Sequence, residues 1–397
     1  MAGSIGPQGC GKVRTVAEME AEGRRLWDLC PVPVLDLRRE RYDRLRRMMD
    51  AEGLDALVIL STAALGNKGN LRYVTNYAPV SRYAGAVFPR RGDPVLFVPY
   101  AVHVRWAESL SWVEDVRFSA SFGTDVAAFL RDRGLVAGRV GLAGEDTVGG
   151  FATTLASELP QAEWVPAAGL LAQTRMVKTP LEIGLARYAG QMAAQALATA
   201  ASLIAQGATE LEIFAASEAQ LRRSGSEENL LLIDSVGRQV MPFPSRRAVV
   251  PGDLVQLSVE PVSPGGHWVQ SVRMFARSDP GPLARRVLPA FIEALNGVQQ
   301  TLRPGVPLRE VAAGIAAALT PIAPQGRIPY GHGIGMDNFE PPVPSMDSDV
   351  VAQENIILVI HPALSVEGRH FYLGDTYWVT GKSAQRLTEY PLELIVV

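Results

Sequence analysis

The C-terminal part of the chain carries one order of elements twice, and this duplication limits the possible folds more than any other feature. The first copy opens with Thr179-Pro180-Leu181-Glu182, a capping box with proline at the first helical position, and apolar residues follow at helical spacing as far as Gly207. A second helix starts at Thr209, and strands are predicted after it over 229–233, 254–259 and 267–276. The order recurs with helices over 283–302 and 308–319 and strands over 355–360 and 371–379. We therefore expect two similar halves that face each other, with a ligand site between them.

A smaller α/β domain is predicted over residues 34–173. Its first helix lies between Asp36, a plausible N-cap, and Gly53, and further strands and helices are predicted over 54–60, 95–98, 126–133 and 140–143. Residues 1–33 are predicted to form an extension. Within it, residues 6–12 (GPQGCGK) nearly match a phosphate-binding loop, but Val13 stands where that motif needs Ser or Thr, so a flexible tail is expected. The second domain then covers 174–397.

Composition excludes several classes of partner and location. The formal net charge is -3 and no dense block of Lys and Arg occurs, so neither nucleic acid nor an anionic membrane is an expected partner. The two cysteines, Cys10 and Cys30, both fall in the extension and cannot form a disulfide framework. The first residues lack the apolar core of a signal peptide, and the most apolar stretch, 311–324, is too short to span a bilayer. A cytoplasmic protein is expected.

Four segments of the second domain belong together. They are residues 251–258 (PGDLVQLS), 266–273 (GHWVQSVR), 331–342 (GHGIGMDNFEPP), and 360–362 with 374–376 (IHP and GDT). Taken in order, they resemble the catalytic domain of the creatinase, prolidase and aminopeptidase P family. The resemblance covers roughly residues 36–397. It implies an α+β fold, with a pita-bread C-terminal domain after a smaller creatinase-type N-terminal domain, and it also implies a homodimer.

The sequence departs from the family at the positions that hold metal. Metallopeptidases of this family bind two divalent ions through two Asp, one His and two Glu, because these ligands offset the charge of the ions and bridge them. The matching positions here are Ser258, Gln270, His332, His361 and Gly374. One ligand of the five is kept, so no metal cofactor is expected. Creatinase works without metal and uses a histidine as its acid/base, but Met241 stands at that position.

Three side chains are predicted to be catalytic. His332 and His361 occupy former ligand positions, should face one space, and could act as acid and base near neutral pH. Glu260 lies two residues after Ser258 and shares its face of the strand, so it could supply a carboxylate. The alternatives are that His361 is a neutral core residue and that Glu260 is a surface residue at a strand end.

Eight residues are predicted to bind substrate or to support the site. With the acidic ligands lost, nearby arginines should make the pocket neutral or positive, which suits a carboxylate, sulfate or phosphate on the ligand. His267, next to the predicted turn, is expected to be exposed. The eight are Arg238, Arg246, Arg273, Ser258, Gln270, Asp375, Trp268 and Tyr377, with Asp375 in a supporting role and the two aromatic residues as walls. Tyr330, Tyr372 and Trp378 are further candidate walls, and one or two of the five aromatic residues are expected to contact the ligand.

Three functions remain open from the sequence. The first is a metal-independent enzyme that acts on a small, anionic, amino-acid-derived substrate by elimination or ring closure, with loss of sulfate or phosphate, in specialised metabolism. The second is metal-free hydrolysis of a C–N bond, as in creatinase, which the fold favours and Met241 opposes. The third is an inactive binding scaffold, although the acidic or basic tails typical of scaffolds are absent.

Overall fold

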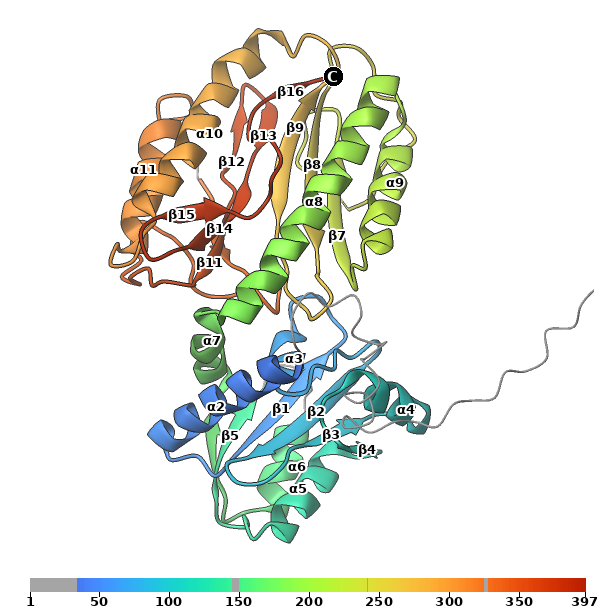
Figure 1. Cartoon of the computed structure of the whole chain (residues 1–397), viewed down its shortest axis with the longest axis vertical. Coiled ribbons are helices and arrows are strands. Elements are labelled where there is room, and N and C mark those ends of the chain that lie inside the picture. The colour runs from blue at the N-terminus through green and yellow to red at the C-terminus, as the bar shows by residue number, and fades with distance from the viewer. Residues whose placement is uncertain (1–33, 145–149, 241, 325–327) are drawn as a thin grey trace, which may run out of the picture.

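The computed structural model describes residues 34–144, 150–240, 242–324 and 328–397. Two domains lie end to end, and helix α7 (Ala168–Met176) stands between them (Figure 1). The predicted boundary at residue 173 falls inside this helix. In the described part of the chain, every helix is too short or too polar to cross a lipid bilayer.

The N-terminal domain is a six-stranded mixed sheet with helices on both faces. The strand order is β4-β3-β2-β1-β5-β6. Leu57 and Ile59 of β1 pack in one core with α2 and α3, whereas Val58 and Leu60 pack on the other face in a core with α5. The strands are β1 (Ala56–Thr62), β2 (Tyr83–Pro89), β3 (Val95–Val98), β4 (Asp115–Phe118), β5 (Arg139–Ala143) and β6 (Glu163–Pro166). The helices are α2 (Val34–Glu52), α3 (Gly69–Thr75), α4 (Ala101–Leu110), α5 (Phe122–Asp132) and α6 (Phe151–Glu158).

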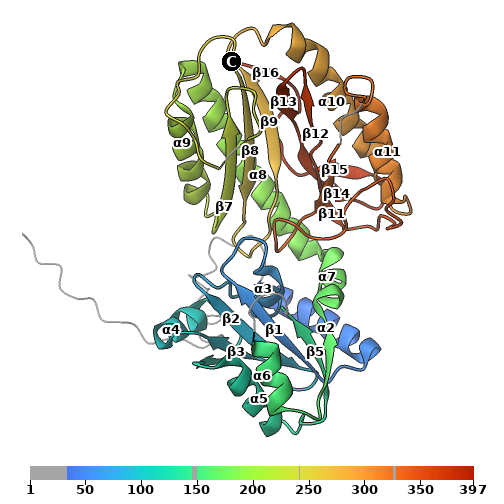
Figure 2. The ribbon, with the colours of Figure 1, turned by 180° about the vertical axis from the view of Figure 1, so that it is seen from behind.

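The C-terminal domain has the two facing halves that the duplicated pattern predicts. In the first half, α8 (Pro180–Gln206) and α9 (Glu210–Arg223) pack against a sheet of order β16-β9-β8-β7 (Figure 2). In the second, α10 (Gly281–Thr301) and α11 (Leu308–Leu319) cover a sheet of order β10-β11-β14-β15. The first sheet comprises β7 (Asn229–Asp234), β8 (Leu254–Pro261), β9 (Ser271–Ala276) and β16 (Ile395–Val396). The other strands are β10 (Gly331–Gly333), β11 (Ile357–Ile360), β14 (Asp375–Val379), β15 (Ala384–Arg386) and the hairpin of β12 (Ala363–Val366) and β13 (Arg369–Tyr372).

Local signals placed the helix ends well and the strand ends less well. Both capping boxes are present, at Thr179 and Thr209, and the first helix ends at Gly207 in the left-handed conformation. Two strand predictions were too long. The segment 267–276 forms β9 only from Ser271, because the Trp268 backbone N–H instead donates to Gly335 O. The segment 371–379 is divided between β13 and β14 by a break at Gly374.

Candidate active site

Four segments meet where the two halves of the C-terminal domain join. Ser258 lies in β8 and Gln270 just before β9, whereas His332 lies in β10 and His361 directly follows β11. The halves are linked by an isolated bridge in which the Val272 N–H donates to Gly374 O at 3.0 Å. Residues far apart in the sequence are therefore brought together at this junction.

His332 and His361 lie against each other. Their ring centroids are 5.0 Å apart in an edge-to-face arrangement. His332 Nδ1 lies 2.8 Å from Gly333 O, and because a carbonyl only accepts, Nδ1 carries the proton and Nε2 keeps its lone pair. Both ring nitrogens of His361 are buried and have no partner among the described residues. Burial lowers the pKa of both rings, in His361 to about 3 with a further contribution from His332, so both are neutral at pH 7.

A line of hydrogen bonds connects Glu260 to Tyr372. Ser258 Oγ donates to Glu260 Oε1 at 3.1 Å, and Gln270 Nε2 donates to Ser258 Oγ at 3.1 Å and to Tyr372 Oη at 2.7 Å. Glu260 is buried and is also hydrogen-bonded to Asn338, so the alternative of a surface residue is wrong. Burial raises the pKa of Glu260 to about 8, which leaves the carboxyl protonated at neutral pH.

The surrounding fold is that of a known enzyme family. The model of metallopeptidase family M24 matches residues 184–382, and the creatinase/prolidase N-terminal domain matches residues 41–177. The chain belongs to the M24 family. An uncharacterized peptidase of Bacillus subtilis is 22% identical over 90% of this chain and 100% of its own length. An Xaa-Pro dipeptidase of Pyrococcus horikoshii is 22% identical over 91% of this chain and 100% of its own.

Solved structures share the whole fold. The X-Pro aminopeptidase of Thermotoga maritima superposes with a TM-score of 0.80 at 19% identity, covering 90% of this chain and 99% of the other. The prolidase of Pyrococcus horikoshii gives a TM-score of 0.76 at 20% identity, covering 90% and 100%. The pita-bread domain and the creatinase-type domain expected from the sequence are thereby confirmed.

The residues at the M24 metal positions do not fit two metal ions. Ser258 and Gln270 offer only neutral oxygens, and they are already hydrogen-bonded to one another. At Gly374 a Cβ atom would lie 2.4 Å from His361 Cβ and 2.7 Å from its Cα, so no glutamate side chain can stand there unless His361 moves. Within the described residues, no three His, Cys, Asp or Glu side chains gather as a metal site would require.

Arg273 does not bind substrate, contrary to the sequence prediction. Its side chain is 0% exposed, and its guanidinium donates to Asp375 Oδ2 at 2.7 Å, Gly374 O at 2.8 Å and Pro391 O at 2.6 Å. Asp375 also accepts from Arg386 at 3.3 Å, and its supporting role is structural. Every strong donor of Arg273 is therefore used within the fold.

The predicted aromatic walls Tyr377 and Trp268 are also wrong. Tyr377 is fully buried, and its hydroxyl donates to Leu295 O of α10 at 2.9 Å. Trp268 packs in the core with α8 and α9. Side chains alternate between the faces of a strand, and Tyr377, which pairs with Leu358, falls on the other face of its sheet from His332, which pairs with Val359.

The other two arginines give little support for a positive pocket. The Arg238 side chain is 73% exposed and forms an ion pair with Asp234 at 3.4 Å. Arg246 is exposed as well. Met241, which occupies the position of the creatinase base, lies outside the described residues. The predicted anionic substrate thus loses Arg273, its most central contact.

Two residues of the site, Asn338 and Phe339, were not singled out from the sequence, whereas Tyr372 was among the candidate aromatic walls. Phe339 lies over His332 with ring centroids 4.5 Å apart, Asn338 reaches Glu260, and Tyr372 lies 5.6 Å from His361. Phe339 and Asn338 belong to the segment 331–342 that carries the family resemblance, so their place in the site could have been inferred from it. Tyr372 is the last residue of β13 and is the candidate aromatic wall that lies against His361.

Ion pairs and hydrogen bonds join the loop that follows β10, residues 334–340, to the N-terminal domain and α7. The Asp337 carboxylate accepts from the backbone N–H groups of Lys68 and Gly69 at 3.0 and 2.9 Å and from Arg175 at 2.9 Å. Glu340 accepts from Lys178 at 3.0 Å and also pairs with Arg175. These contacts fix the loop, because each carboxylate is buried and satisfied.

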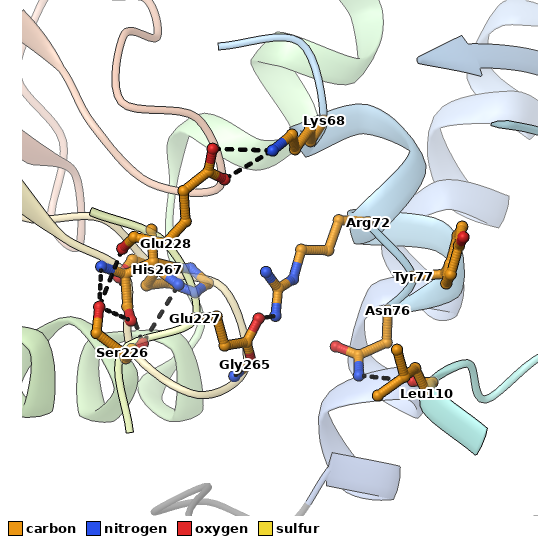
Figure 3. A network of polar contacts seen from close by, with 12 residues as sticks. Lys68, Arg72, Asn76, Tyr77, Leu110, Ser226, Glu227, Glu228, Gly265 and His267 are labelled. Carbon is orange, nitrogen blue, oxygen red and sulfur yellow. Dashed lines mark hydrogen bonds and ion pairs between the residues drawn. The ribbon is translucent and has the colours of Figure 1, made fainter. Parts of the chain in front are cut away.

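Further contacts join the domains beside this loop. Figure 3 shows Lys68 and Arg72 reaching across to Glu228 and Glu227. His267 lies close by and is 1% exposed, so the prediction that it is exposed was wrong. Its Nε2 lies 3.8 Å from Glu182, but burial dominates and lowers its pKa to about 3. His267 is thus a neutral histidine in the interface between the two domains.

Proposed function

We propose that this M24 protein is a metal-independent enzyme that acts on a small molecule by acid–base chemistry, through elimination or ring closure. The proposal rests on the surroundings of His361. This residue stands at a former glutamate ligand position, both of its ring nitrogens are buried without a partner, and it touches His332. Buried polar groups without partners are uncommon, and catalytic sites are one of the places where they occur.

His332 is suited to be the base. Its Nε2 holds a free lone pair because Nδ1 donates to Gly333 O. His361, with a pKa of about 3, is a much weaker base and serves better as a neutral hydrogen-bonding group for the substrate. Glu260 is suited to be the acid, because its raised pKa keeps it protonated near pH 7.

The chemistry follows from these protonation states. His332 Nε2 removes a proton from the substrate, and the electron pair of the broken bond forms a new π bond or closes a ring. The leaving group departs with the proton of the Glu260 carboxyl, and transfer of a proton from His332 to Glu260 restores the enzyme. Ser258, Gln270 and Gly374 do not provide the metal-bound water that hydrolysis uses in the metallopeptidases, so water could be activated here only by a base such as His332.

A second candidate is hydrolysis of a C–N bond without metal. It is favoured by the relatives, since those named above are a peptidase and an Xaa-Pro dipeptidase. The two reactions differ in the mass of the product. Hydrolysis adds one water and divides the substrate, whereas elimination and ring closure release a group without adding water.

The test compares metabolites from cells with the gene, without it, and with His332→Asn. Asparagine places an amide nitrogen near the position of Nδ1, so it can keep the bond to Gly333 O while it removes the base. His103→Asn is the control, because His103 lies on α4 in the other domain. The proposal expects one precursor to accumulate both without the gene and with His332→Asn, but not with His103→Asn. Full conversion by His332→Asn would refute it, and a product formed with water would favour hydrolysis.

A further inference from the structure

The geometry of the site also restricts its substrate. We infer that the part of the substrate that enters the site is uncharged and flat, aromatic or conjugated, with hydrogen-bonding heteroatoms at its edge. This inference rests on the proposed function, because it concerns the same site and assumes that a substrate binds there. It replaces the anionic substrate that the arginines suggested in the sequence.

One side of the site is a continuous row of rings. Phe339 lies 4.5 Å from His332, His332 lies 5.0 Å from His361, and His361 lies 5.6 Å from Tyr372, all measured between ring centroids. His370 continues the row at 6.3 Å from Tyr372. Such a wall presents faces and edges of rings, and a flat unsaturated group packs against them better than a compact charged one.

Phe339 forms the outer end of this row. Its side chain is 57% exposed, although it belongs to a loop that Asp337 and Glu340 fasten firmly on either side. A large exposed aromatic on a rigid segment, stacked on a histidine of the site, offers apolar area to a ligand. The row thus continues from solvent at Phe339 to the buried ring of His361.

A group of hydrogen-bonded polar side chains adjoins this row at Tyr372. Ser258, Gln270 and Tyr372 are neutral side chains that hydrogen-bond with one another, and the buried Glu260 carboxyl is hydrogen-bonded to the uncharged Ser258 and Asn338. His361 adds one donor and one acceptor, both unused. These groups can form hydrogen bonds with the nitrogen and oxygen atoms at the edge of an amide, lactam, imide, ketone or phenol.

The charges next to the site are already neutralised. Asp337 and Glu340 pair with Arg175 and Lys178, and Arg273 pairs with Asp375. A charged ligand group would therefore have to compete with these existing partners for a counter-ion. Burial of an unpaired charge is strongly unfavourable, whereas a neutral group that forms hydrogen bonds is accepted.

Three ring compounds of the same shape test the inference: benzamide, which is neutral, benzoate, which is negative, and benzamidine, which is positive. The full-length protein is labelled with ¹³C at histidine Cε1, and its five histidines give one signal each. The His332 and His361 signals are assigned with the Asn variants. A ligand of this size binds with a Kd on the order of 10 mM, so each compound is added up to about 50 mM near pH 7.

We expect benzamide to shift the His332 and His361 signals and to leave the His103 signal in place. Benzoate and benzamidine should need at least about tenfold higher concentration for the same shift. Phe339→Ala should weaken benzamide about fivefold or more by removing the stacked ring. Phe118→Ala is the matched control, since Phe118 is 50% exposed on β4 of the other domain.

Two results would overturn the inference. One is a shift of these two signals by benzoate or benzamidine at the concentration that benzamide needs, or below it. The other is no shift by any of the three compounds. Failure of the proposed function looks different, because it is full metabolite conversion by His332→Asn, whichever compound binds.

Discussion

Glu260→Gln should make the protein's stability less sensitive to pH, because Glu260 resists ionisation only in the folded state. Its pKa rises from 4.5 to about 8 on folding, and the cause is burial. A carboxyl with a raised folded pKa adds stability below its unfolded pKa, and this stability is lost as pH rises through the folded value. Glutamine resembles the protonated acid and can keep the bond from Ser258, so the variant lacks this loss.

The size of the effect follows from the two pKa values. Between about pH 5.5 and pH 8 the unfolded chain ionises this group and the folded chain largely does not, which lowers the wild-type free energy of unfolding by about 3 kcal/mol relative to the variant. All other titrating groups are common to both proteins, so they cancel in the difference.

Urea unfolding of both proteins at the two pH values measures this difference. We expect the variant to gain about 3 kcal/mol over wild type on going from the lower to the higher pH. A change in the difference below about 1 kcal/mol would mean that Glu260 ionises normally in the fold. In that case neither the buried acid nor its role as proton donor in the proposed reaction would stand.

Three further predictions concern the histidines, the buried arginine and metal. In ¹³C-histidine NMR, His267 and His361 should remain neutral to about pH 4.5, because burial lowers both pKa values to about 3, and a midpoint near 6 for either one would contradict its burial. Arg273→Met should lower the free energy of unfolding by about 3–5 kcal/mol, because it removes the buried ion pair of Asp375, which keeps only the longer contact to Arg386, and leaves several buried carbonyls without donors, whereas exposed Arg246→Met should change it by less than about 0.5 kcal/mol in the same urea series. Manganese or zinc at about 1 mM should raise the melting temperature by less than about 1 °C, because the M24 ligand positions do not fit the ions, and a rise of several degrees that chelator reverses would show a metal site.

Parts of the site that depend on residues close together in the sequence could be predicted, whereas parts that depend on contacts between distant segments could not. The segment 331–342 located His332, and strand periodicity put Glu260 on the same face as Ser258. Trp268 and Tyr377 could not be assigned in the same way, since their direction depends on where β9 and β14 begin. Strand ends are set by pairing between distant segments, and the break at Gly374 moved them.

The sequence predicted where the site residues lie better than it predicted which charged side chains are free to bind a ligand. Arg273 looked like an anion-binding residue because its partners, Asp375 and the Pro391 carbonyl, are about a hundred residues away in the chain. Whether an arginine is free or satisfied depends on distant groups that only folding brings to it. The same reason explains His267, which the turn beside it suggested was exposed and which the domain interface buries.

The sequence by itself indicated the two-domain pita-bread architecture through its resemblance to a known family, and the helix starts at Thr179 and Thr209 through local capping patterns, because both depend on residue types at particular positions. Only the tertiary structure decided the burial that raises the pKa of Glu260 and lowers those of His332 and His361. A pKa depends on burial and on neighbours in space, and both arise when segments far apart in the chain pack together.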